Sequence, residues 1–209
     1  YGGNIVWVES NNRIPTSEEY DATALAIQEE TGANPVHPYD DLRTIAGQAT
    51  CALELLEEVP DIDYLLAPVG GGGLLSGTCS AAAALATGTK VVGCEPEKAD
   101  DAWRSFQEGT IVPQTDPQTI ADGLRTSLGE YTFPIIAANV SEIVTVSEDA
   151  ILRSMRLVWE TMKIIIEPSA AVPVAALLEK KISGHADRIG VILSGGNVDL
   201  DSLPDWPEL

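Results

Sequence analysis

Residues 64–77 read YLLAPVGGGGLLSG, a short apolar run that passes through four consecutive glycines into a helix-forming segment. The apolar run predicts a buried β-strand, and the residues after the glycines predict a helix over residues 74–86. Glycine has no Cβ and allows positive φ, so such a loop can turn several N–H groups toward one anion, beside the positive end of the helix. The four glycines are Gly70, Gly71, Gly72 and Gly73.

This glycine run is compatible with a phosphate cradle and with a tight turn between strand and helix. It does not fit a P-loop, because no Gly-Lys-Ser/Thr follows it. It does not fit the dinucleotide pattern either, which is GxGxxG followed by an acidic residue about 20 positions later. The predicted ligand is therefore a phosphate that has further anchors elsewhere in the chain.

The chain alternates between strand and helix patterns. Further strands are predicted at residues 5–8, 90–94 and 143–146. Residues 189–200 read IGVILSGGNVDL, a last strand followed by a second glycine loop. Alternating βα units predict an α/β fold with an open, mostly parallel sheet covered by helices on both faces. Ligands of such sheets bind at the carboxyl ends of the strands, where both glycine loops fall.

Four other motifs accompany the two glycine loops in a fixed order. They are HPYDDLRTIAGQAT at 37–50, EPEKADD at 95–101, TIADG at 119–123 and EPSA at 167–170. The set resembles the pyridoxal-phosphate (PLP) enzymes of fold type II, the tryptophan-synthase-β group, and within it the serine racemases and serine/threonine dehydratases. The resemblance covers nearly the whole chain.

The resemblance implies a PLP site. In the family, the tetraglycine loop holds the cofactor phosphate, which corresponds to Gly70–Gly73, and the serine of the second loop bonds the pyridine nitrogen, which corresponds to Ser194. A neutral hydroxyl there leaves the ring nitrogen largely unprotonated, which suits proton abstraction at Cα followed by β-elimination or reprotonation. Without the resemblance, Ser194 is equally compatible with a turn residue at a strand end.

A divalent metal is also implied. Glu95, the carbonyl of Ala99 and Asp101 offer three oxygen donors on one short loop, the ligand type that hard cations prefer, although an acidic loop is commonly only solvated. In serine racemases this pattern binds Mg²⁺ or Ca²⁺. The resemblance also implies ATP as an activator at Lys163 and Asn197, although Lys163 equally suits the C-terminal end of a helix.

The family's Schiff-base lysine, in a Ser-x-Lys-x-Arg-like segment, and its catalytic serine have no counterpart in the sequence and are expected upstream of Tyr1. The lysines present are Lys90, Lys98, Lys163, Lys180 and Lys181. The chain is therefore interpreted as the C-terminal two-thirds of such an enzyme, inactive alone. Residues 1–40 are assigned to the remainder of a small domain and 41–209 to an incomplete large PLP-binding domain.

The expected function is that of a fragment of a serine/threonine ammonia-lyase or serine racemase, homodimeric at full length, acting on a small hydroxy amino acid. Alternatives are a 3-hydroxyaspartate dehydratase and a non-catalytic PLP-fold remnant that binds a phosphate ligand or a partner. A sugar- or nucleotide-phosphate-binding protein unrelated to PLP would require the Ser194 and Glu95 motifs to be coincidental.

Composition restricts the partners. The formal net charge of −20, with only 12 Lys and Arg, argues against nucleic acid binding and is compatible with a solvated acidic face or with a high-salt environment. No apolar run approaches the length of a membrane span, so a cytoplasmic protein is expected. Cys51, Cys79 and Cys94 are predicted to be buried, reduced thiols.

Overall fold

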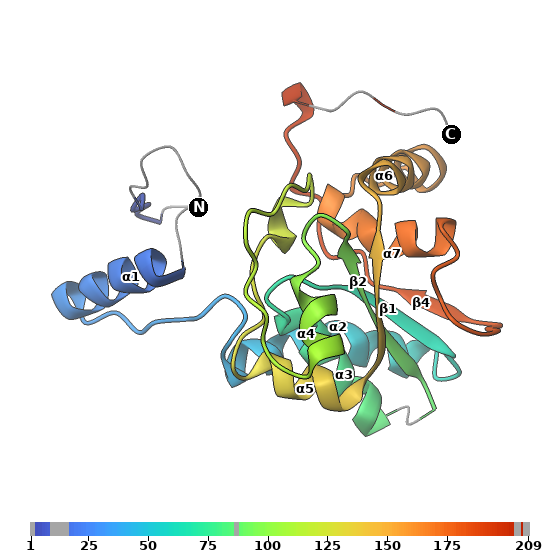
Figure 1. Cartoon of the computed structure of the whole chain (residues 1–209), viewed down its shortest axis with the longest axis horizontal. Helices are drawn as coiled ribbons and strands as arrows, with labels where there is room; N and C mark the ends of the chain where they lie inside the picture. Colours follow the sequence, from blue (N-terminus) through green and yellow to red (C-terminus); the bar gives the residue numbers. More distant parts are fainter. Residues whose placement is uncertain (1–2, 9–16, 86–87, 203–205, 207–209) are drawn as a thin grey trace. The chain divides into compact units, whose positions relative to one another are not determined.

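A computed structural model describes residues 3–8, 17–85, 88–202 and 206 (Figure 1). The chain divides into two compact units, Tyr1–His37 and Pro38–Leu209. The first unit contains helix α1 (Ser17–Thr31). The strand predicted at residues 5–8 is wrong: residues 3–8 form no regular element, and Trp7 is 82% exposed. An apolar segment becomes a strand only where a neighbouring strand pairs with its backbone, and no described strand pairs with this one.

The second unit is built on a parallel sheet of four strands in the order β3-β2-β1-β4. The strands are β1 (Tyr64–Pro68), β2 (Lys90–Pro96), β3 (Val140–Val146) and β4 (Ile189–Val191). Leu66 at the centre of β1 pairs with Val92 on one side and Val191 on the other. All five residues of β1 are buried, as expected of a central parallel strand. The predicted parallel α/β sheet is confirmed.

Helices cover both faces of this sheet. Helices α6 and α7 lie on one face, and α2, α3 and α5 lie on the other (Figure 1). The helices are α2 (Leu42–Glu58), α3 (Gly73–Leu85), α4 (Asp101–Glu108), α5 (Thr132–Asn139), α6 (Glu148–Met162) and α7 (Pro168–Leu178), with 3₁₀ turns η1 (Asp122–Leu124) and η2 (Leu200–Ser202). No helix in the described ranges is both long and apolar enough to cross a membrane.

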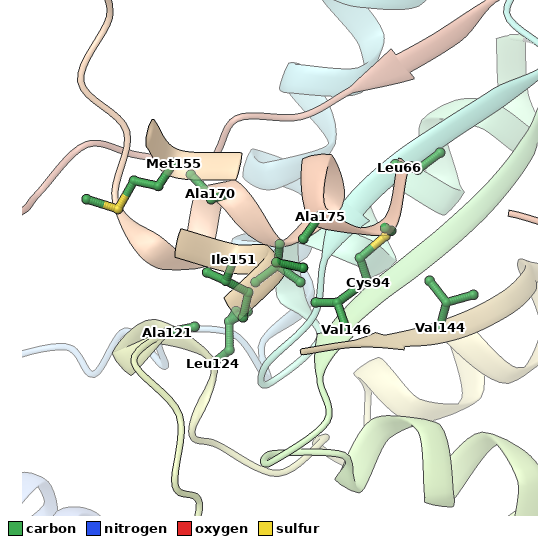
Figure 2. Close-up of a cluster of buried hydrophobic side chains, with 14 of the residues drawn as sticks. Leu66, Cys94, Ala121, Leu124, Val144, Val146, Ile151, Met155, Ala170 and Ala175 are labelled. Carbon is green, nitrogen blue, oxygen red and sulfur yellow. The ribbon is translucent and has the colours of Figure 1, made fainter. Parts of the chain in front are cut away.

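The two faces of the sheet have separate hydrophobic cores because side chains alternate along each strand. On one face Leu66, Cys94 and Val146 point toward Ile151 of α6 and Ala175 of α7 (Figure 2). Leu65 and its neighbours in β2 and β3 pack against α2, α3 and α5 on the other face. The sheet is packed between these two cores, which hold its strands in place and so fix the positions of the loops at its carboxyl edge.

Helix periodicity predicts most buried positions but fails at helix ends. The apolar residues Leu42, Ile45 and Leu56 are spaced so that they fall on one face of α2; Ile45 and Leu56 are buried, but Leu42 at the first position is 59% exposed. Met162, at the last position of α6, is also exposed. Cys79 and Cys94 are buried, whereas Cys51 is exposed because it lies off the buried stripe of α2.

Candidate functional site

The two glycine loops follow neighbouring strands. β1 pairs with β4 in parallel, and the N–H of Ile192 continues the pairing by donating to Leu66 O at 3.0 Å. Gly70 comes two residues after β1, and Ser194 comes three residues after β4. Adjacent parallel strands lie about 5 Å apart, so both loops leave the same edge of the sheet side by side.

The tetraglycine loop is buried and closely packed. A Cβ on Gly70 would lie 3.0 Å from Gly123 O, and one on Gly73 would lie 2.9 Å from the Cβ of Tyr39. Gly72 has a φ of +90°, which residues with a Cβ rarely adopt. Helix α3 begins at Gly73, directly after this turn. Only glycine fits these positions, and the loop presents backbone at the N-terminal end of a helix.

Glu167 holds the second glycine loop. Its backbone N–H donates to Gly195 O at 3.0 Å, and its Oε2 accepts a hydrogen bond from the N–H of Asn197 at 2.9 Å. Ser194 and Asn197 are both exposed. The backbone N–H and the carboxylate of Glu167 thus hold Gly195 and Asn197, and together they fix the course of the loop after Ser194.

Two more motifs join this region. Ser169 Oγ accepts a hydrogen bond from the N–H of Gly123 at 3.2 Å, which links the EPSA segment to the TIADG segment. Gly123 O in turn lies against Gly70. Glu167 and Ser169 lie in motifs that are recognisable in the sequence, but their roles as loop supports depend on contacts across 30 and 46 residues. No local sequence pattern predicts contacts over such separations.

This edge of the sheet fits a phosphorylated cofactor. The loop is a cradle that side chains would fill, and it lies at a helix N-terminus, where backbone N–H groups and the helix dipole favour an anion. Ser194 follows the neighbouring strand, β4, and brings its hydroxyl to the same edge of the sheet. The next residue is glycine, and a Cβ at Gly195 would lie only 3.0 Å from the Glu167 carboxylate. The arrangement therefore suits a phosphorylated cofactor such as PLP.

The predicted metal ligands lie at the end of β2 and in the segment that leads into α4. Glu95 and Asp101 are both fully buried, and Ala99 between them is 1% exposed. Glu95 Oε1 and Oε2 accept hydrogen bonds from the N–H groups of Ala102 and Trp103, each at 2.9 Å, at the start of α4. Burial and the charge of Asp101 raise the pKa of Glu95 well above its usual value. Burial likewise raises the pKa of Asp101 to about 7.

These two acids fit a hard cation as a donor set. Asp101 Oδ1 accepts from Gln114 Nε2 at 2.8 Å, but its buried Oδ2 has no hydrogen-bond partner. A divalent cation would satisfy that oxygen and favour the charged form of both carboxyl groups, which burial disfavours. Among the described residues, no group of three or more His, Cys, Asp or Glu side chains gathers as metal ligands, so a cation here would also need the Ala99 carbonyl and water.

Lys163 and Asn197 occupy different loops. Lys163 ends α6 in the left-handed conformation, with a φ of +59°, and Asn197 follows the second glycine loop. Lys90 opens β2 at the amino edge of the sheet, opposite the glycine loops, with its Nζ 5.2 Å from the centre of the Tyr64 ring. The position of Lys90 at that edge separates it from the cofactor cradle.

Comparison with known proteins agrees with this geometry. Residues 1–195 match the family described as "Pyridoxal-phosphate dependent enzyme". The chain is 47% identical to a β-hydroxyaspartate dehydratase of Paracoccus denitrificans over 98% of its own length and 63% of that protein. It is also 47% identical to the serine racemase of Dictyostelium discoideum, over 90% of this chain and 59% of the relative.

A solved structure gives the same result for the fold. The crystal structure of the T.th. threonine deaminase superposes with a TM-score of 0.84 at 47% identity, and the match covers 90% of this chain and 62% of that one. The chain therefore spans less than two thirds of the length of each of these relatives.

Proposed function

Because the chain belongs to the family of pyridoxal-phosphate dependent enzymes, we propose that it forms the PLP-binding part of an ammonia-lyase (dehydratase) or racemase that acts on a small hydroxy amino acid. The observation that carries the proposal is the buried tetraglycine loop at the end of β1 beside the Ser194 loop at the end of β4. The names of the relatives support the substrate class: one acts on hydroxyaspartate, one on serine and one on threonine. The 3-hydroxyaspartate dehydratase remains a candidate within this class.

Different residues of the chain bind different parts of the cofactor. The backbone of Gly70–Gly73 and the start of α3 bind the phosphate, and the Ser194 hydroxyl meets the ring nitrogen. When bound, PLP supplies the electron sink that makes the Cα proton of an amino acid removable. A hydroxyl at the ring nitrogen leaves that nitrogen neutral, in contrast to a carboxylate, and moderates the sink. Glu167 keeps Ser194 in place by fixing the following loop.

We assign no catalytic residue within residues 1–209. The lysine that binds the cofactor covalently and the serine that moves a proton on the opposite face belong, in this proposal, to a segment outside the chain, so the chain alone is inactive. Residues 1–40 then form the remainder of a small domain and 41–209 the large one. The whole enzyme is proposed to be a cytoplasmic homodimer. The alternative is a non-catalytic remnant that binds a phosphate ligand or a partner.

Two regulatory ligands complete the proposal. Glu95, Ala99 and Asp101 are proposed to bind Mg²⁺ or Ca²⁺, and the partnerless Asp101 Oδ2 supports a cation there. Lys163 and Asn197 are proposed to contact ATP. Their support is the motif match alone.

Borohydride reduction in the presence of PLP tests the assignment of the covalent lysine. Peptide mapping of the reduced 209-residue chain is expected to find no specific pyridoxyl group on any of its five lysines, and assays are expected to find no ammonia release from L-serine, L-threonine or 3-hydroxyaspartate. A longer protein that carries this chain with an upstream lysine is expected to show both. Specific modification of Lys163 together with turnover by the 209-residue chain would overturn the assignment.

A further inference from the structure

Thr132, the first residue of α5, links that helix to the tetraglycine loop. Its side chain is fully buried, and its Oγ1 donates a hydrogen bond to Gly71 O at 2.8 Å. The same oxygen accepts from the N–H of Gly129 at 2.8 Å. A hydroxyl has one proton, and the other acceptor within reach, Gly129 O, lies farther away at 3.4 Å. The proton is therefore directed to the glycine loop.

Asp40 holds Thr132 in this position. Its Oδ1 accepts from the N–H groups of Tyr131 at 2.8 Å and Thr132 at 3.1 Å, and its Oδ2 accepts from that of Glu130 at 3.0 Å. The carboxylate thus takes up N–H groups around the first turn of α5, the groups that a helix leaves unpaired. Ser76 Oγ donates to Thr132 O at 3.2 Å from the opposite side. The backbone of Thr132 is fixed at both its N–H and its C=O.

The hydrogen bond to Gly71 O decides which way the next N–H points. The peptide between Gly71 and Gly72 is trans, so its C=O and N–H point in opposite directions. Between two glycines this peptide has no side chain to restrict its rotation. With the C=O held by Thr132, the N–H of Gly72 is turned away from α5.

We propose that Thr132, held by Asp40, is a positioning residue that orients the Gly72 N–H toward the cofactor phosphate. This inference rests on the proposed function, because it assumes that the tetraglycine loop binds a phosphate. Neither residue contacts the ligand in this scheme. Without the hydroxyl, the glycine peptide would be free to turn its C=O, a hydrogen-bond acceptor, toward the phosphate.

The test compares two ligands that differ only in the phosphate, pyridoxamine 5′-phosphate and pyridoxamine. Neither reacts with lysine, so calorimetric titration of the 209-residue chain reports binding alone. The affinity ratio of the two ligands measures the phosphate contacts. Thr132→Val, which keeps the shape and removes the hydroxyl, is expected to lower this ratio about tenfold, as for one lost charge-assisted hydrogen bond. Thr132→Ser is expected to restore the wild-type ratio to within about twofold.

Thr78→Val is the matched control. Thr78 is equally buried, and its hydroxyl donates a hydrogen bond within α3, to Leu74 O at 2.8 Å, so its removal should leave the ratio unchanged. If the wild-type chain binds both ligands equally, the phosphate cradle itself is refuted and the proposed function fails. If the wild type prefers the phosphorylated ligand and Thr132→Val keeps that preference, only the role of Thr132 is refuted.

Asp40→Asn decides the matter if Thr132→Val does not fold. The amide replaces one acceptor oxygen with a donor that faces backbone N–H groups, which loosens the start of α5 while the Thr132 hydroxyl remains. The affinity ratio is then expected to fall about threefold, since positioning is weakened and not removed. An unchanged ratio in this folded variant would overturn the proposal.

Discussion

The ring of Tyr39 lies directly on the backbone of Gly71. A Cβ built on Gly71 would overlap the Cγ and Cδ atoms of that ring, and one on Gly73 would lie 2.9 Å from the Cβ of Tyr39. Tyr39 therefore closes one side of the tetraglycine loop, and the loop needs glycine for packing as well as for any ligand.

Gly71→Ala is expected to lower the free energy of unfolding by about 1–3 kcal/mol, because the added methyl group displaces the Tyr39 ring. Urea unfolding measures the change. Gly47→Ala is the control: Gly47 lies within α2 with nothing within 4 Å of an added Cβ, so this change should raise stability by about 0.5–1 kcal/mol. Adding Tyr39→Ala to Gly71→Ala should recover part of the loss. No recovery would show that the ring is not the source of the strain.

Ser194→Ala should weaken binding of pyridoxamine 5′-phosphate and of pyridoxamine by the same factor, about fivefold, because the hydroxyl is proposed to bond the ring that both ligands share. The affinity ratio should stay constant, in contrast to the effect of Thr132→Val. Ser80→Ala, on an exposed position of α3, is the control and should change neither affinity. Unchanged binding in Ser194→Ala would place the ring elsewhere.

Mg²⁺ should raise the melting temperature of the protein by about 5 °C at saturating concentration, because an ion that binds only the native state stabilises it. Glu95→Ala should abolish this gain. Glu97→Ala, which removes an exposed carboxylate from the same loop, should retain it. An equal Mg²⁺ response in both variants would reject the Glu95–Asp101 site.

Thiol reagents at mildly alkaline pH should modify Cys51 and leave the other two cysteines intact until the chain unfolds. Cys51 is exposed, although partial burial and the charge of Glu54 raise its pKa above the usual value; burial raises the pKa of Cys79 to about 12 and raises that of Cys94 further still. The reactive thiolate is therefore scarce at the buried positions. Mass spectrometry before and after adding urea gives the count. Cys51→Ser should remove the labelling of the native chain, and early labelling of Cys94 would contradict the buried core.

The strands of the parallel sheet could be predicted because buried parallel strands are short apolar runs between glycines and polar turns, as in β1 and β2, but the similar apolar run at residues 5–8 forms no strand. Helix α5 (TFPIIAAN) could not. It is eight residues long, contains Pro134 and is apolar on most of its surface, so it has no helical period to recognise. Its start depends on Asp40, 92 residues before Thr132. A carboxylate that caps a helix across such a separation leaves no local pattern.

The candidate site divides in the same way. The glycines and Ser194 could be proposed because their motifs are contiguous. Thr132, Glu167 and Ser169 support those motifs from other segments, and their contacts exist only once the sheet has formed. The exposure of Leu42 shows the opposite limit: helical spacing gives the side of a helix on which a residue lies, but not whether a neighbouring element covers that residue.

The strand order has a consequence for the order of folding. β1 meets β2 only 26 positions further along the chain, at Tyr64 and Lys90, but it meets β4 at Ile189, 125 positions away. Bringing β4 to β1 closes the longer loop and therefore costs more chain entropy, and β4 is only three residues long, so its pairing adds few stabilising hydrogen bonds. We therefore expect β4 to dock after the other three strands. Ser194 would then come beside the glycine loop in the last step. The proposed site could therefore bind both the phosphate and the ring of its ligand only when folding is complete.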